Sequence, residues 1–516
     1  MKIHRLFNIL MVIFFSLAIT IPLVAVNKTS GKISSDENRV LAKFPSFSNG
    51  QEGLNTQFIK EFDTWFNDNL GFREKLVKAN TMLQYALFGK LTRSDTVIGK
   101  DNWLFLMYPN MIQAYQNLDL PTKDKYQQYI VKFNQLNKYF NSIKTPFITM
   151  VNPDKETVYP EKVPDTIYKV GDLSKTDLVI DHLTNNTELD IFSPKNSLIK
   201  AKSSATVYSQ NYDLTHWNQY GAFVSYLELM NRVKKYIPEI KIVSWNDFTI
   251  TPYKRTTMLY GKVPFEETDY NFSYNKEYST IKEVGPLDKF NLISSNLSFR
   301  YVNPNNNKLP KALIMGDSYV YMFMLPYLAE SFSELTFLHK DNMGDIKNFV
   351  NVLKPDIFIL EFMEPALHQF VDTISYSESY FENYDKYKDL PIKPNPQEGL
   401  MWIDSSNNNL VQSKDSIVID KTDKVVSLVG WAVDANAGNT ADNIFLKVGE
   451  KYYSGTYGTP RTSVSDYFKN PNLTNSGFTF TLNAADLINV GKFSLVIISK
   501  DKKYQYFPVE YKVVVK

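Results

Sequence analysis

The chain has 516 residues, enough for two or three domains with hydrophobic cores of their own. Its hydrophobic content of 43% is ordinary for folded protein, and a net charge of +2 without any cluster of Lys and Arg argues against a nucleic-acid partner. The absence of cysteine excludes disulfide bonds and a cysteine nucleophile. The five scattered histidines form no metal-binding pair, so we expect neither a metal nor another cofactor.

Residues 1–27 predict a membrane anchor. Lys2, His4 and Arg5 form a basic start, and residues 9–26 are an uncharged, mostly apolar run of about the minimum length for crossing a bilayer. The residues that follow do not form a good small-x-small cleavage site, which favours an uncleaved anchor over a cleaved signal peptide. We therefore expect a cell-membrane protein with a single N-terminal anchor and the bulk of the chain outside the cytoplasm.

Apolar strands alternate with amphipathic helices over most of the following chain. Helical spacing of apolar residues marks residues 56–90, 123–142 and 219–236, and short apolar runs mark strands at 145–151, 312–315, 335–338 and 357–362. Such alternation predicts an α/β fold, a parallel sheet with flanking helices. The polar, Asn-rich stretch 250–310 predicts an irregular insertion.

From about residue 401 the pattern changes to short β-type runs separated by turn residues. This spacing predicts a C-terminal β-sandwich. The expected division of the chain is an anchor at 1–27, a polar stalk at 28–55, a catalytic α/β domain at 56–385, a linker at 386–405 and the β-sandwich at 406–516.

A candidate nucleophile stands at the end of one predicted strand. The apolar run Ala312–Met315 stops at Gly316-Asp317-Ser318, and a segment of helical character follows. This layout places the Ser318 hydroxyl at a strand-to-helix turn, where backbone N–H groups can stabilise an oxyanion. A turn serine and a helix-capping aspartate would give the same local pattern.

The base and its orienting group are expected about one hundred residues upstream, at Asp213 and His216. A serine hydroxyl needs a base to remove its proton, and a carboxylate behind an imidazole fixes its tautomer. An Asp-x-x-His segment supplies both groups. The weaker candidates for oxyanion or substrate contacts are Gly316, Asp317, Tyr319, Asn152, Lys155 and Trp217.

These motifs resemble the SGNH-hydrolase superfamily, and more narrowly the alginate O-acetylation proteins AlgJ and AlgX and related polysaccharide acetyltransferases. In that group the Asp/His segment precedes the serine, as it does here. The resemblance covers roughly residues 55–370 and is carried by FNDNLGFREKLVKAN, VIGKDNWLFL, VNPDKETVYPEKVP, DLTHWNQYGA, KALIMGDSYV and KPDIFILEF.

The chain departs from the group at two places. The group has its acid two residues before the histidine, where this chain has Leu214, and the three-residue spacing of ordinary SGNH enzymes assigns Asp213 instead. After the late strand the group often has Glu-Arg, and here it is Glu364-Pro365. Any role of that arginine is missing.

The resemblance implies an extracytoplasmic O-acetyltransferase. Ser318 would carry the acetyl group as an ester, His216 would act as the base, and the acceptor would be a hydroxyl of an exported polysaccharide. The expected donor partner is a membrane-bound O-acyltransferase, and the C-terminal domain resembles carbohydrate-binding modules of some members. Two alternatives stay open: a carbohydrate acetylesterase that uses the same residues, and a non-catalytic glycan-binding surface protein.

Overall fold

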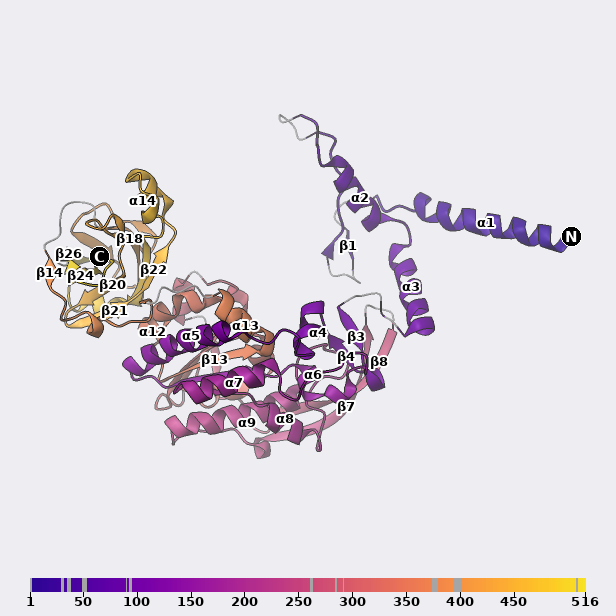
Figure 1. Cartoon of the computed structure of the whole chain (residues 1–516), viewed down its shortest axis with the longest axis horizontal. Coiled ribbons are helices and arrows are strands. Elements are labelled where there is room, and N and C mark those ends of the chain that lie inside the picture. Colours follow the sequence, from indigo (N-terminus) through magenta and orange to yellow (C-terminus); the bar gives the residue numbers. More distant parts are fainter. Residues whose placement is uncertain are drawn as a thin grey trace.

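The computed structural model describes residues 2–28, 32–34, 39–48, 53–89, 91, 95–259, 263–283, 285–290, 292–373, 379–393, 401–506 and 509–516. Figure 1 shows three parts in chain order: an N-terminal helical arm, a central α/β unit and a C-terminal β lobe. The predicted architecture, an α/β unit built on a largely parallel sheet with a C-terminal β-sandwich and an apolar N-terminal helix, is confirmed.

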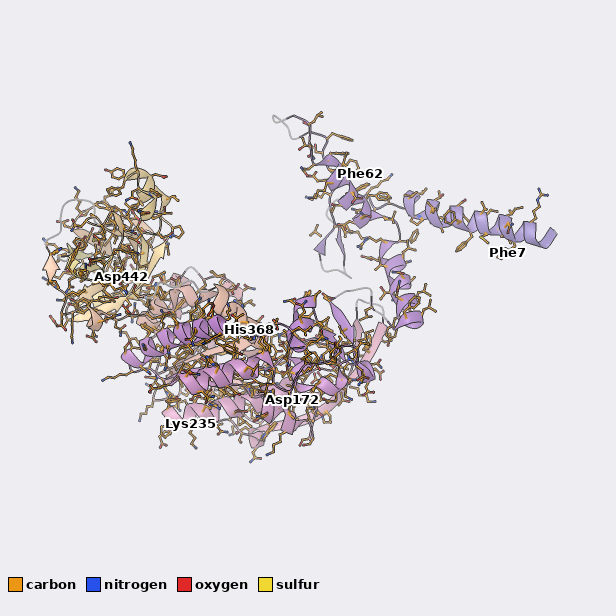
Figure 2. All side chains as sticks on the ribbon, in the orientation of Figure 1. Phe7, Phe62, Asp172, Lys235, His368 and Asp442 are labelled. Carbon is orange, nitrogen blue, oxygen red and sulfur yellow. The ribbon has the colours of Figure 1, made fainter. Side chains whose placement is uncertain are left out.

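The arm consists of three helices and a small hairpin: α1 (Lys2–Val24), β1 (Ile33–Ser34), β2 (Arg39–Val40), α2 (Phe58–Asn69) and α3 (Arg73–Phe88). Residues Arg5–Val24 of α1 are long and apolar enough to cross a membrane, as an anchor or as a signal sequence. Apolar side chains of the arm such as Phe7 and Phe62 project outward (Figure 2). The single helix expected near 56–90 is divided in two, because Phe72 adopts a left-handed φ of 60°.

The end of α1 is fixed against the turn between α2 and α3. The Gly71 N–H donates to the Pro22 carbonyl at 3.0 Å, and Asn27 N–H donates to the Asn69 carbonyl at 2.8 Å. A Cβ at Gly71 would lie 2.6 Å from the Ala25 carbonyl oxygen, so only glycine permits this approach.

The central sheet has the strand order β6-β5-β13-β11-β12-β10-β9. Its strands are β5 (Phe147–Asn152), β6 (Asp190–Phe192), β9 (Ile281–Glu283), β10 (Phe299–Val302), β11 (Lys311–Gly316), β12 (Glu334–His339) and β13 (Ile357–Met363). The strands from β6 to β12 pair in parallel, as expected, whereas β10 and β9 add in antiparallel fashion at one edge. β10 is antiparallel to the strands beside it because the connection from β10 to β11 is short and contains no helix, whereas a parallel crossover would need a longer connection.

Helices cover both faces of this sheet because successive strand residues face opposite ways. On β13, Ile357 and Ile359 belong to one core cluster, and Phe358 and Leu360 belong to the other. The helices of the central unit are α4 (Pro109–Tyr115), α5 (Lys123–Ser142), α6 (Lys155–Val158), α7 (Lys175–Asn186), α8 (Lys195–Ala201), α9 (Gln219–Tyr236), α10 (Ser318–Phe323), α11 (Leu325–Ala329), α12 (Ile346–Leu353) and α13 (Glu364–Thr373).

Two antiparallel pairs flank the sheet: β3 (Thr96–Ile98) with β4 (Leu104–Leu106), and β7 (Phe248–Leu259) with β8 (Val263–Tyr274). The second pair is a long hairpin, so the prediction of an irregular insertion from residue 250 is wrong for this part. Its alternation was hidden because two of the four residues that β8 buries are charged, with Glu267 only 4% and Asp269 only 8% exposed. When buried positions of a strand hold ion-paired residues, the sequence does not alternate between apolar and polar residues, and the strand cannot be recognised by that pattern.

The C-terminal lobe packs two sheets face to face around one core. One sheet contains β14 (Ile392–Lys393), β17 (Ser416–Ile419), β20 (Asn443–Val448), β21 (Lys451–Ser454), β24 (Lys492–Ile498), β25 (Gln505–Tyr506) and β26 (Val509–Val515). The other contains β15 (Met401–Ser406), β16 (Asn409–Leu410), β18 (Val425–Asp434), β19 (Asn439–Thr440), β22 (Thr456–Thr459) and β23 (Gly477–Asn483). Two short helices, α14 (Thr462–Tyr467) and α15 (Ala484–Ile488), complete the lobe.

The segment expected as a linker, 386–405, contains β14 and most of β15. β14 pairs with β25 inside the lobe. Just before it, Tyr384 stacks on Tyr452 at a ring distance of 3.6 Å. Part of the expected linker is therefore built into the lobe.

Helix α12 joins the central unit to the lobe through a buried amide. Asn348, 1% exposed, donates to the Thr456 hydroxyl at 3.0 Å and to the Thr479 carbonyl at 3.2 Å. Its oxygen accepts from the Thr481 N–H at 2.9 Å. Both ends of one side chain thus bond to strands β22 and β23 of the lobe.

We expect Asn348→Ala to destabilise the contact between the lobe and the central unit by about 1–3 kcal/mol, because it leaves the Thr481 N–H buried without an acceptor. The measurement is chemical denaturation together with the rate of limited proteolysis between the two parts. Asn351→Ala is the matched control, since Asn351 makes one such bond, to the Ser454 carbonyl at 2.8 Å. Equal effects of the two substitutions would contradict the assignment.

Candidate active site

Ser318 lies at the carboxyl edge of the central sheet, as the first residue of α10. β11 ends at Gly316, and Asp317 caps the helix by accepting the Tyr319 N–H at 3.2 Å. The second carboxylate oxygen of Asp317 accepts the Met363 N–H at 2.9 Å. The strand-to-helix turn is therefore tied to the end of the neighbouring strand β13, and Ser318 itself stays partly exposed.

His216 and Asp213 meet this serine. His216 Nε2 lies 2.7 Å from Ser318 Oγ, and His216 Nδ1 lies 2.9 Å from Asp213 Oδ2. Asp213 Oδ1 also accepts the backbone N–H groups of Thr215 and His216, each at 2.9 Å. The three side chains form one continuous hydrogen-bonded chain from carboxylate to hydroxyl.

The environment of Asp213 favours its charged form. Burial raises the pKa of this carboxyl, but the hydrogen bond and charge of His216 and the two backbone N–H groups together hold the pKa well below its usual range. A permanently ionised carboxylate keeps the Nδ1 proton on the side facing Asp213. His216 Nε2 is then left free to accept the Ser318 proton.

Lys155 holds the loop that carries the acid and the base. The side chain is 0% exposed, and its Nζ donates to the carbonyls of Leu104 and Asp213, each at 2.7 Å, and of Gln210 at 3.4 Å. Burial lowers the pKa of Lys155 to about 7, although the Asp213 and Glu267 carboxylates act in the opposite direction. Lys155 is therefore not placed for the contact with an oxyanion or a substrate that was expected from the sequence, because its Nζ donates to backbone carbonyls instead.

A second brace comes from the β7–β8 hairpin. Glu267 accepts the Ser209 hydroxyl at 3.0 Å and the Asn211 N–H at 2.8 Å, and Ser209 Oγ in turn accepts the Asp213 N–H at 2.9 Å. Arg255 compensates the charge of Glu267 at 2.6 Å. The Arg255 guanidinium also stacks on the Tyr212 ring, 3.7 Å from its centroid. The hairpin thus holds the same loop through contacts separate from those of Lys155.

Beneath the Ser318 turn lies a buried carboxyl, Glu361 on β13. It accepts the Asp317 N–H at 2.8 Å and the side-chain amide of Asn152. Burial raises the pKa of Glu361 well above its usual range, and the adjacent Asp317 raises it further. A Cβ at Gly316 would lie 2.2 Å from Glu361 Oε2, which explains the glycine.

Asn152 and Trp217 are not placed for the substrate contacts expected of them. Asn152 is 0% exposed, and its amide donates to Glu361. Trp217 is also fully buried, and its indole N–H donates to the Tyr319 carbonyl at 3.1 Å. Tyr319 is buried as well, with its hydroxyl on the Thr215 carbonyl at 2.9 Å. Trp217 and Tyr319 therefore pack the base loop against the nucleophile helix.

Glu267, Ser209 and Arg255 were missed from the sequence. The signal that marks them is the run Phe265, Glu267, Asp269, in which every second residue of one strand is buried. Within the described ranges no group of three or more His, Cys, Asp and Glu is arranged to hold a metal ion.

Residues 96–284 match the family model described as "SGNH hydrolase-like domain, acetyltransferase AlgX". These residues, which make up less than half of the chain, are similar to the AlgX domain. This confirms the resemblance to the AlgJ and AlgX group. The matched residues include Asp213 and His216 and end before Ser318. No curated protein matches the chain.

Solved structures match with low scores. Bacillus cereus PatB1 with a sulfonyl adduct shares 16% identity at a TM-score of 0.40, covering 54% of this chain and 96% of that one. The O-acetyltransferase domain of Pseudomonas putida AlgJ shares 15% identity at a TM-score of 0.35, covering 55% and 97%. A DHHW family protein from Eubacterium siraeum shares 12% at 0.35, covering 56% and 98%.

We expect Lys155→Met to lower kcat on a chromogenic acetyl ester by about 10–100-fold with a smaller effect on KM, because it releases the loop that positions Asp213 and His216. The measurement is steady-state kinetics together with a thermal unfolding curve. Lys200→Met, a change at an exposed position on α8, is the control and should leave kcat unchanged. A folded Lys155→Met protein with full kcat would contradict the bracing role.

Proposed function

We propose that this protein is an extracytoplasmic O-acetyltransferase that moves acetyl groups to hydroxyls of an exported polysaccharide through an ester on Ser318. The observation that carries the proposal is the hydrogen-bonded chain Asp213–His216–Ser318 at the carboxyl edge of the sheet. The AlgX-like match of residues 96–284 supports polysaccharide O-acetylation at the level of the family.

In the first half-reaction Ser318 Oγ attacks the carbonyl carbon of an acetyl donor while His216 Nε2 takes the hydroxyl proton. The tetrahedral intermediate collapses, the donor's leaving oxygen departs with that proton, and acetyl-Ser318 remains. Asp213 stabilises the imidazolium that forms between these two steps.

In the second half-reaction a sugar hydroxyl attacks the acetyl carbon of acetyl-Ser318. His216 Nε2 takes the proton of the sugar hydroxyl and returns it to Ser318 Oγ as the ester bond to the enzyme breaks. The products are the O-acetylated sugar and the free serine. If water replaces the sugar hydroxyl, the same residues release acetate, which is the esterase alternative.

The N-terminal helix supports the proposed location. α1 is apolar over Arg5–Val24, and the basic residues Lys2 and Arg5 precede or begin this stretch. By the positive-inside rule they would stay in the cytoplasm and the remainder of the chain would lie outside. An acetyl donor must then reach the outer side of the membrane, so the proposed donor partner is a membrane-bound O-acyltransferase.

Covalent trapping on Ser318 tests the proposed function. The protein is incubated with a chromogenic acetyl ester, with and without oligosaccharide acceptors, and its mass is followed together with the acceptor's. We expect an acetyl adduct on Ser318 and acetylated acceptor, both lost in Ser318→Ala and kept in the control Ser203→Ala. An adduct that yields only acetate with every acceptor would favour the esterase. A Ser318→Ala protein indistinguishable from wild type would overturn both enzymatic functions.

We expect Asp213→Asn to reduce kcat/KM for the acetyl ester by about 10³–10⁴-fold with the fold retained, because an amide neither holds the imidazole in the required tautomer nor stabilises the imidazolium. The assay is ester hydrolysis, with circular dichroism to verify folding. Asp181→Asn, an exposed change of the same charge on α7, is the control. A loss below about tenfold would argue that Asp213 is not the orienting acid.

A further inference from the structure

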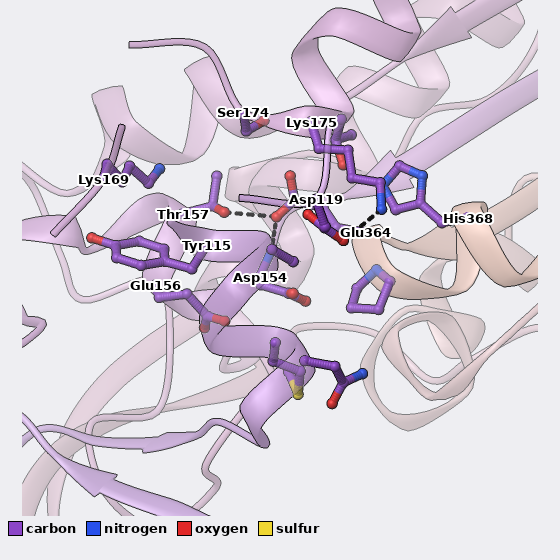
Figure 3. Close-up of a pocket in the computed structure, with 15 residues that line it drawn as sticks. Tyr115, Asp119, Asp154, Glu156, Thr157, Lys169, Ser174, Lys175, Glu364 and His368 are labelled. Atoms are coloured by element: carbon purple, nitrogen blue, oxygen red, sulfur yellow. Dashed lines mark hydrogen bonds and ion pairs between the residues drawn. The ribbon is translucent and has the colours of Figure 1, made fainter. Parts of the chain in front are cut away.

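A cavity lies at the same edge of the central sheet, separate from the residues that bond to Ser318. It encloses about 180 Å³ between α4, α6, the start of α7 and the start of α13 (Figure 3). That volume equals the share of about six liquid water molecules. Its walls include no member of the Asp213–His216–Ser318 chain.

The cavity is close to the nucleophile along the sheet. Asp154, which follows β5, and Glu364, which follows β13, both line it. β11, which ends before Ser318, pairs with β13, and β13 pairs with β5. Two strand spacings of about 4.8 Å therefore separate the β5 end from the β11 end. The cavity wall and the serine thus lie at the same end of neighbouring strands.

Four carboxyl groups and two lysine side chains line this cavity. Asp119 is already paired with Lys175 at 2.8 Å. Asp154, Glu156 and Glu364 remain, and Figure 3 shows them grouped together. The other lining ammonium is Lys169, whose Nζ sits over the Tyr115 ring, 4.6 Å from its centroid.

The Asp154 carboxylate is the unpartnered group in this cluster. Asp154 is 6% exposed, and its Oδ1 accepts no hydrogen bond from the described residues. Glu364 differs, because it accepts the Asp154 N–H at 2.9 Å and the Thr157 hydroxyl at 2.7 Å. A buried acceptor without a donor costs free energy unless a ligand or water supplies the donor.

We propose that this cavity binds a primary ammonium group carried by an amino-sugar unit of the acceptor, with the Asp154 and Glu156 carboxylates as its partners. An ammonium brings the donors that Asp154 Oδ1 lacks, and its positive charge favours the ionised form of the neighbouring carboxyls. The Thr157 hydroxyl, whose proton is donated to Glu364 at 2.7 Å, still offers its oxygen as an acceptor to a sugar hydroxyl. The choice of acceptor rests on the proposed function.

The carboxyl groups of this cluster are weaker acids than usual, because they are buried and lie close to one another. Burial raises the pKa of Asp154 well above its usual range and the pKa of Glu156 to about 7. Since protonation removes the attraction, ammonium binding should weaken as the pH falls through about 7. Burial lowers the pKa of His368 to about 3, so it stays neutral there. The charged and titratable groups that share the cavity with Glu156 are Asp154, Glu364, His368, Asp119, Lys169, Lys175 and Tyr115.

The test is calorimetric binding to the full-length protein in detergent, with four probes. Glucosamine carries the ring and the ammonium, N-acetylglucosamine the ring with a neutral amide, glucose the ring alone, and ethanolamine the ammonium alone. We expect glucosamine to bind about tenfold or more tightly than each of the other three. Equal affinity for glucose would overturn ammonium recognition, and ethanolamine binding as tightly as glucosamine would overturn the assignment to a sugar.

Asp154→Asn keeps the shape and removes the charge, and we expect it to weaken glucosamine binding about tenfold or more. Glu156→Gln should act in the same direction, which covers the case in which one variant does not fold. Asp172→Asn, exposed and outside the cavity wall, is the matched control and should bind as wild type (Figure 2). Unchanged affinity in folded Asp154→Asn would overturn the proposal.

The same titration on Ser318→Ala separates this inference from the proposed function. If acetyl transfer is never observed but glucosamine binds with the stated preference, the cavity stands and the transferase does not. If Ser318 transfers acetyl and no probe binds, the transferase stands and the ammonium site is overturned.

Discussion

The placement of the proposed base, His216, depends on one buried amino group, that of Lys155. The loop that carries Asp213 and His216 forms no regular helix or strand of its own, so its position must come from elsewhere. Lys155 fixes the position of this loop by donating to carbonyls of the loop and of β4. Glu267, on the β7–β8 hairpin, fixes it by accepting a backbone N–H of the loop. Both partners are buried, where a charge-assisted hydrogen bond is strong and its loss is costly. The geometry at Ser318 follows from these two braces.

Several acidic side chains lie at the carboxyl edge of the sheet, and each has a different role that depends on its hydrogen-bond partners. Asp213 is held in its charged form by His216 and backbone N–H groups. Burial raises the pKa of Glu361 well above its usual range, and this carboxyl supports the turn before Ser318 by accepting the Asp317 N–H. Asp154 has neither a cation nor a donor on Oδ1. The first serves the imidazole, the second the backbone, and the third is open to a ligand.

The regular part of the fold was accessible from apolar periodicity alone. The helix at 219–236 and the strand at 357–362 were placed within a residue or two of α9 and β13, because each buries an apolar face or run of the expected period. The β7–β8 hairpin was missed for the converse reason. Glu267 and Asp269 occupy its inward face as ion pairs with Arg255, and charge at buried positions hides the strand signal.

The sequence by itself determined which residue types stand at strand ends: a serine after Gly316 and Asp317, and an Asp-x-x-His segment upstream. It also determined the apolar N-terminal helix and the change to short β runs near residue 401. Only the tertiary structure decided that Lys155 braces a loop and that Trp217 is core rather than a cleft wall. A motif fixes the chemistry of a side chain, whereas its direction depends on contacts between segments that lie far apart along the chain.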